Sequence, residues 1–346
     1  MKKSFFLLGV AVAAMTSCSN DKLLDQAEPI QRAIGFESFV NKTTKAITTT
    51  DNPTAQAGLS KFYVHGYYGT TDVFTGKEVT KTIEGDNIKS WDYQLANDEQ
   101  QPYWTNNEYY FAAYAQGNNE TSIDGVQYSN ETLSIPFTAQ YTTSENAVTI
   151  CDVKDLVADL KTEQGLISRT AAVDFSFKHL LAKIKFTIKN NSPENLPMTI
   201  TNLVINGVKI NGTFTSTNSA NWKPNQSDWE VSGNAMTNFI PILGSANQIA
   251  KGATVVSEDY LVIPQEFGET IKYSFTATFY DNKGSIVSVK EFNNSFTINK
   301  NQITHTAWQP NTYYNYVIGV PSSVNPIKFN VTGVSGWGDP KVITLN

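Results

Sequence analysis

A chain of 346 residues is long enough for two domains of ordinary size, and 17% of its residues are charged, against roughly 25% in a typical soluble domain. The formal net charge is −6 and the sequence has no basic patch, which excludes nucleic acid as an expected partner. With two cysteines, one of them beside the N-terminal apolar run, the chain is not a disulfide-stapled scaffold. The 16 tyrosines and 19 phenylalanines favour a β-rich fold, because aromatic side chains suit a half-buried pleated surface.

The N-terminus has the features of an export signal. Two lysines precede the apolar run Phe5–Ala14, which is too short to cross a bilayer as a helix. The following Met15-Thr-Ser-Cys18 resembles the lipobox of bacterial lipoproteins, in which the signal is removed just before a lipidated cysteine. We therefore expect residues 1–17 to be a signal peptide and Cys18 to carry the lipid. The alternative is an ordinary cleaved signal followed by an incidental cysteine.

A short polar tether, residues 18–32, leads into the body of the protein. Each buried methylene of a lipid chain contributes about 0.8 kcal/mol, so a multiply acylated Cys18 would hold the protein on a membrane without a transmembrane helix. We expect the first strand over Ala33–Val40, with its apolar side chains on one face. The Thr-rich stretch Asn41–Gly58 has no periodicity and is predicted to be a mobile loop.

The centre of the chain, Val173–Asn190, contains two alternating apolar runs of opposite parity. The first run is Val173, Phe175 and Phe177, and the second is Ile184, Phe186 and Ile188. Because side chains repeat every two residues in a strand, the chain must change phase at Lys178–Leu181, by a β-bulge or a short kink. We expect the first run to close one domain or bridge two, and the second to open the next β-layer.

Several other segments predict strands. Ile271–Phe279 alternates strictly, and the turn residues of Asp281–Gly284 lead into Ile286–Phe292, which predicts a hairpin. Strands recur along the chain with one helix at most, so the sequence predicts an all-β fold of the sandwich type.

Two segments leave alternatives open. Leu133–Phe137 contains Pro136, which has no N–H for a central ladder, so this strand should lie at a sheet edge or end there. Asp152–Gly165 has apolar residues at helical spacing, and a strand through Asp155–Ala158 is nearly as compatible with the sequence.

Catalytic motifs are absent from the sequence. It contains no metalloprotease, nucleophile-elbow, phosphate-loop or dinucleotide signature. The three histidines, His65, His179 and His305, stand far apart, with no Cys or His neighbour at ligand spacing. We therefore predict a protein that is not an enzyme and has no catalytic, cofactor-binding or metal-binding residues.

Aromatic side chains in or near loops offer a second kind of site. They are Trp91, Tyr93, Tyr103, Trp104, Trp222 and Trp229. Aromatic rings either bind sugars or pack cores and sheet rims, and packing is the more frequent use. A cell-surface glycan-binding lipoprotein is therefore the alternative function.

Several segments together resemble a known family, the fimbrillins, which are type V pilus subunits and their relatives in Gram-negative oral and gut anaerobes. Each segment is a weak signal, but they follow the family's order and span most of the chain. They are the lipobox at Cys18, Arg32-Ala-Ile-Gly-Phe36, Asp155-Leu-Val-Ala158, Phe175-x-Phe177-x-His179-x-x-Ala182-x-Ile184-x-Phe186, Asn311–Gly319 and Val334-x-x-Trp337.

The resemblance implies two tandem transthyretin-like β-sandwich domains, which we place at 33–170 and 171–346. It also implies an outer-membrane lipoprotein on the cell surface, serving as a stalk, tip or anchor subunit of a pilus with a role in adhesion. Its partners would be other pilus subunits, the outer membrane and a host or bacterial surface ligand. In this family a protease removes the N-terminal strand, and an extended segment of another subunit fills the exposed groove by β-strand addition.

The same resemblance implies candidate residues for processing and exchange. Arg32 is the first candidate cleavage site, because the first predicted strand begins at Ala33, and Lys45 is the second candidate. The candidate donor strand is the C-terminal Lys341–Asn346, with Ile343 and Leu345 on one face.

Overall fold

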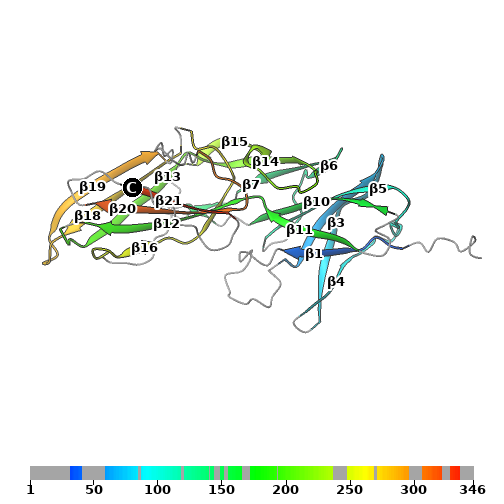
Figure 1. The fold of residues 1–346 in the computed structure, drawn as a ribbon, viewed down its shortest axis with the longest axis horizontal. Coiled ribbons are helices and arrows are strands. Elements are labelled where there is room, and N and C mark those ends of the chain that lie inside the picture. The colour runs from blue at the N-terminus through cyan, green and yellow to red at the C-terminus, as the bar shows by residue number, and fades with distance from the viewer. Residues whose placement is uncertain are drawn as a thin grey trace, which may run out of the picture.

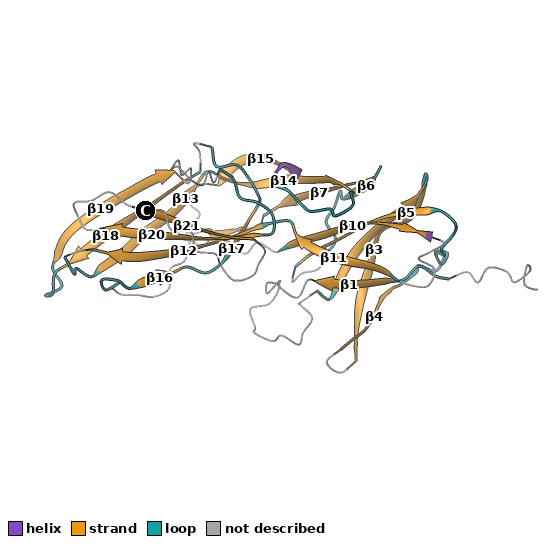
Figure 2. Cartoon of the chain, in the orientation of Figure 1, coloured by secondary structure: helices purple, strands orange, loops and turns teal. Residues whose placement is uncertain are grey.

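The computed structural model describes residues 32–40, 59–84, 87–117, 121–139, 141–143, 149–151, 155–165, 172–192, 194–236, 248–268, 271–295, 306–321 and 328–335. Nearly all regular structure in these residues is β-strand, with a 3-10 turn at Gln226–Asp228 (Figure 2). The all-β prediction is therefore confirmed. The sheets follow one another along the long axis of an elongated molecule (Figure 1).

The first sheet closes on itself around an aromatic core. Its strands, in spatial order, are β1 (Phe36–Val40), β11 (Val173–His179), β10 (Leu156–Gln164), β5 (Glu108–Gln116), β2 (Lys61–Tyr68), β3 (Thr71–Glu84) and β4 (Asn87–Tyr93). Phe62, Phe111 and Phe175 are among the side chains buried inside it. Because alternate residues of these strands are large and apolar, one face of each strand is buried in this core.

A four-stranded sheet joins segments that are distant in sequence. Its strands, in order, are β15 (Trp229–Met236), β14 (Val208–Thr217), β7 (Thr132–Thr138) and β6 (Gln127–Ser129). β7 and β14 are antiparallel neighbours, with Ile135 opposite Phe214. A second core, which includes Leu160 of β10 and Trp229 of β15, packs this sheet against the closed sheet. Residues before 170 and after 171 therefore share both a sheet and a core.

Two further sheets enclose the third core. The five-stranded sheet contains β16 (Thr254–Val256), β12 (Ala182–Asn191), β20 (Thr312–Pro321) and β21 (Lys328–Ser335), and β17 (Tyr260–Val262) is also paired to β12. The three-stranded sheet contains β13 (Met198–Asn206), β18 (Lys272–Tyr280) and β19 (Ile286–Ser295). Phe186 of β12 and Phe275 of β18 are buried in this core. A separate pair is formed by β8 (Tyr141–Thr143) and β9 (Thr149–Cys151).

The predicted change of phase at Lys178–Leu181 is confirmed. β11 ends at His179, β12 begins at Ala182, and the two strands belong to different sheets. β11 directs its apolar residues into the closed sheet, whereas β12 directs its own into the third core. Leu180, between the two strands, is buried in the second core, so the connection itself is packed.

The segment for which the sequence allowed a helix or a strand contains strand β10. Val157 faces the core of the closed sheet, while Leu156, Ala158 and Leu160 face the second core. A strand buried on both faces has an almost continuous apolar run, and such a run also satisfies a helical pattern. Pairing with the whole of β5 decides for the strand.

The predicted hairpin and the proline strand are both present. β18 and β19 are antiparallel neighbours, with Phe275 opposite Phe292. β7 pairs with β14 through Pro136 and as far as Thr138, but with β6 only as far as Ser134. Among the described residues, the strand is therefore an edge at Pro136.

The expected first strand begins later than predicted, at Phe36. The stretch Asn41–Gly58 lies outside the described residues.

Gly66 on β2 provides a test of the closed-sheet core. A Cβ built on Gly66 would lie 2.5 Å from Phe111 Cδ1, and the Phe111 ring is itself buried against other rings. We expect Gly66→Ala to lower the free energy of unfolding by about 1–3 kcal/mol through overpacking. Gly35→Ala is the control, because its nearest neighbour would be Ala172 Cβ at 3.9 Å. Equal effects of the two substitutions in urea unfolding would contradict this packing.

Candidate functional site: the first strand and its groove

The first strand is inserted between two strands that are distant in sequence. β1 pairs in parallel with β11 from Phe36 opposite Val173 to Val40 opposite Phe177. On its other side it pairs with β4 at a single position, Phe36 opposite Trp91. Figure 1 shows β1 lying between β11 and β4. The strand is therefore paired along its whole length with β11 and at a single position with β4.

Phe36 is the principal side chain that β1 buries. It is 3% exposed and is surrounded by the rings of Phe62, Phe74, Tyr93, Phe111 and Phe175, with centroids 5.1 to 6.5 Å away. Ile34, two residues earlier, is also buried. Burying two such side chains stabilises the docked strand by about 1.5–3 kcal/mol each.

Backbone contacts extend this docking to the residues before β1. The Ile34 N–H donates to Pro102 O, and the Trp104 N–H donates to Arg32 O, each at 3.0 Å. The Tyr93 hydroxyl donates to Ile34 O at 2.8 Å, and burial raises the pKa of this phenol. Arg32 itself is exposed at the start of the described chain. The candidate cleavage site is thus accessible at its side chain, although its carbonyl is hydrogen-bonded.

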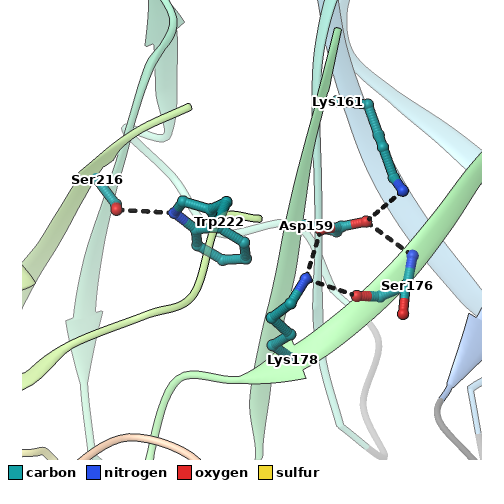
Figure 3. A network of polar contacts seen from close by, with 6 residues as sticks. All are labelled: Asp159, Lys161, Ser176, Lys178, Ser216 and Trp222. Atoms are coloured by element: carbon teal, nitrogen blue, oxygen red, sulfur yellow. Dashed lines mark hydrogen bonds and ion pairs between the residues drawn. The ribbon is translucent and has the colours of Figure 1, made fainter. Parts of the chain in front are cut away.

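β11 carries a buried polar network on the side away from β1. Asp159 of β10 is 1% exposed. Its carboxylate accepts from the Ser176 N–H at 2.7 Å and from Lys178 Nζ at 3.0 Å, and Lys161 Nζ lies 3.6 Å away (Figure 3). A buried carboxylate is tolerated only when it is paired and hydrogen-bonded in this way. The sequence signal for this network is an aspartate inside the otherwise apolar run of β10.

The two histidines that the structure describes belong to no group of residues that could hold a metal ion. His179 is buried, and its Nδ1 lies 2.5 Å from Asp155 Oδ2, which ties the end of β11 to the start of β10. His65 stacks on Tyr114, and burial lowers its pKa below 6.5. No group of three or more His, Cys, Asp or Glu residues in the described parts could hold a metal ion. His305 lies outside them.

The loop aromatics are core residues, as the packing interpretation predicts. Trp91, Trp104, Trp222 and Trp229 are all buried. Tyr93 is half-buried beside Phe36, and only Tyr103, 41% exposed, presents a large part of its surface among the six. These rings are therefore not arranged as a platform for a sugar.

Four candidate residues lie outside the described ranges, and their roles stay predictions. They are Cys18, Lys45, Ile343 and Leu345. In the parts of the chain that the structure describes, there is no helix with the length and apolar character needed to span a membrane.

The described residues form an all-β protein in which the first strand is inserted between β11 and β4 and buries Phe36. The chain belongs to the fimbrillin-like family, whose sequence model matches residues 44–337. A fimbrial protein from Bacteroides vulgatus has a similar fold, with 14% identity and a TM-score of 0.54 over 88% of this chain and 99% of that one. The fimbrial anchor protein Mfa2 from Porphyromonas gingivalis matches with 10% identity and a TM-score of 0.36, over 90% and 99% of the two chains. No curated protein sequence matches the chain.

The five aromatic rings around Phe36 form what we call the aromatic cage, and truncation of the Phe36 side chain tests its contribution to stability. We expect Phe36→Ala to lower the free energy of unfolding by about 3–5 kcal/mol, because it removes a ring from a fully packed core. Ile83→Ala is the control, since Ile83 is 58% exposed and exposed positions change stability by less than about 0.5 kcal/mol. Similar destabilisation by both substitutions in denaturant titrations would contradict the role given to Phe36.

We expect Asp174 on β11 to make the stability of the fold depend on pH. Burial raises its pKa above the ordinary 3.8, with Lys161 opposing and Asp159 adding to the shift. A carboxyl with a raised folded-state pKa destabilises the fold when charged, so its contribution improves as the pH falls from neutral towards 3.8. We expect Asp174→Asn to raise the melting temperature at pH 7, with the difference from the parent shrinking towards pH 4. A difference that is constant over this range would contradict the assignment.

Proposed function

We propose that this protein is a subunit of a surface pilus, in a structural or accessory role, and that subunits join by exchange of the β1 strand. The observation that carries the proposal is the docking of β1. Phe36 fills an aromatic cage, yet β1 is paired along its length only with β11 and at a single position with β4. Membership of the fimbrillin-like family supports the pilus assignment. In this proposal the chain is an outer-membrane lipoprotein with its lipid on Cys18, and the pilus serves adhesion to a surface ligand.

The order of the elements favours one cleavage site over the other. A cut after Arg32 lies before β1, so it leaves the strand attached to the rest of the body. A cut after Lys45 lies beyond Val40 and would separate β1 from the body. We therefore propose Lys45, rather than Arg32, as the cut that vacates the groove. Lys42 is equally placed beyond β1.

The incoming segment has to match what β1 supplies. β1 and the residue before it bury apolar side chains two positions apart, Ile34 and Phe36. Ile343 and Leu345 have the same spacing in Lys341–Asn346, which makes this segment the proposed donor. Main-chain hydrogen bonds to β11 would give about 1 kcal/mol each, and side chains in the cage would add to them.

The two expected domains, 33–170 and 171–346, remain part of the proposal as units of the subunit. The shared sheet of β7 and β14 and the second core supply a broad contact between them. A subunit that carries tension along its length gains from such a contact, because the halves cannot separate without breaking a sheet.

Proteolysis of the purified chain tests the proposal. We expect limited digestion with a trypsin-like protease to produce a ladder of multimers on gels, because the vacated groove accepts the donor of another subunit. The variant Lys42→Gln/Lys45→Gln should stay monomeric, whereas Arg32→Gln should still form the ladder. Deletion of residues 341–346 should allow cleavage but prevent multimers. A chain that loses β1 cleanly and remains monomeric would contradict a polymerising role.

A further inference from the structure

β11 is shared between two neighbours that hold different parts of it. β1 pairs with Val173–Phe177, and β10 pairs only with Lys178 and His179. Among the described residues, the first part of β11 thus takes its strand partner from β1 alone. That part is also held by the side chains of Phe175 and Phe177 in the first core and by the Ser176 N–H, which donates to the buried Asp159.

The end of β11 makes contact with the second core through Lys178, next to the packing of Leu180 in the same core. Lys178 Nζ is 3.0 Å from Asp159 Oδ1 and also lies over the Trp222 ring, 5.0 Å from its centroid. Trp222 follows β14, is 5% exposed, and donates from Nε1 to Ser216 Oγ at 2.9 Å. Figure 3 shows Lys178 between Asp159 and Trp222. We call the set Asp159, Lys178 and Trp222 the latch.

One residue, Ser176, contacts both the latch and β1. Ser176 is opposite Phe39 of β1, and its N–H is one of the donors to Asp159. If β1 leaves, residues 173–177 lose their strand partner, and this donor is held in place only by the packing of Phe175 and Phe177 and by its bond to Asp159. A buried carboxylate that loses a donor is strongly destabilised, so Asp159 and the lysine paired with it must rearrange.

We propose that occupancy of the β1 position is coupled through β11 to the latch. The contact of Lys178 with the Trp222 ring, which we call the joint, is then firm only when a strand fills the groove. The coupling is a property of the intact chain, whereas its use in a fibre rests on the proposed strand exchange. In a fibre it would make the packing of the closed sheet against the second core stiff only after the groove has been filled. Coupling between two sites is reciprocal, so loosening the latch should also loosen β1.

Backbone amide exchange in the full-length, uncleaved chain measures both ends of the coupling. The Val173 N–H donates to Gly35 O at 2.8 Å and reports the attachment of β1, whereas the Trp222 N–H donates to Ser219 O at 3.0 Å and reports the joint. We expect Phe36→Ala to speed exchange at Trp222, and Lys178→Met to speed exchange at Val173, each on the order of tenfold. The amide of Phe275 in the third core should be unchanged, which separates local from global opening.

Lys183→Met is the matched control. Lys183 also pairs with a carboxylate, Asp259 at 2.7 Å, and also lies over a ring, that of Tyr313 at 5.1 Å, but on β12. It should leave both reporter amides unchanged. The double variant Phe36→Ala/Lys178→Met should show less than the sum of the two single effects, since both release the same element. Phe36→Leu is a milder second variant that serves the same comparison if Phe36→Ala does not fold.

Two results would overturn the coupling: faster exchange at Val173 with no change at Trp222 in the Phe36 variants, or fully additive effects in the double variant. Either would mean that the packing around Trp222 does not depend on the occupancy of the groove. The outcome is independent of strand exchange, because a chain that is never cleaved and never polymerises still gives these amide rates.

Discussion

The pairing of β1 with β11 is the interaction on which the rest of the structure depends. It completes the closed sheet, supplies hydrogen-bond partners for the first part of β11, and brings Phe36 into the centre of the first core. Each of these roles could be filled by another strand of fitting pleat and side-chain spacing, because backbone hydrogen bonds carry no sequence identity. The same interaction that completes the fold is thus the one that a second chain could replace.

β11 also links this replaceable element to the remainder of the molecule. It leads through Leu180 and Leu181 into β12, so one continuous segment contributes to the first core, the second core and the third. The sheet of β7 and β14 binds the same regions together a second time. Because interiors are closely packed, the proposed coupling would transmit a change at one end of this segment as a shift between discrete arrangements.

Two polar pairs with buried carboxylates connect β11 with β10. Asp159 is satisfied by Lys178 and by the Ser176 N–H, and His179 is paired with Asp155. Both pairs lie where β11 meets β10, which is the point at which the chain leaves the closed sheet. They fix the path of the backbone through that connection.

The sequence by itself determined the β class, the hairpin of β18 and β19, the change of phase after Phe177 and the family resemblance, because a period of two residues and turn chemistry are local properties. Only the tertiary structure decided that the run around Val157 is a strand, that β7 pairs with β14, and that Phe36 and Trp222 lie at two ends of β11. Apolar periodicity predicts that one face of a segment is buried, but it does not predict which other segment packs against that face. The partner is fixed by contacts between segments far apart in the chain, which no local pattern contains.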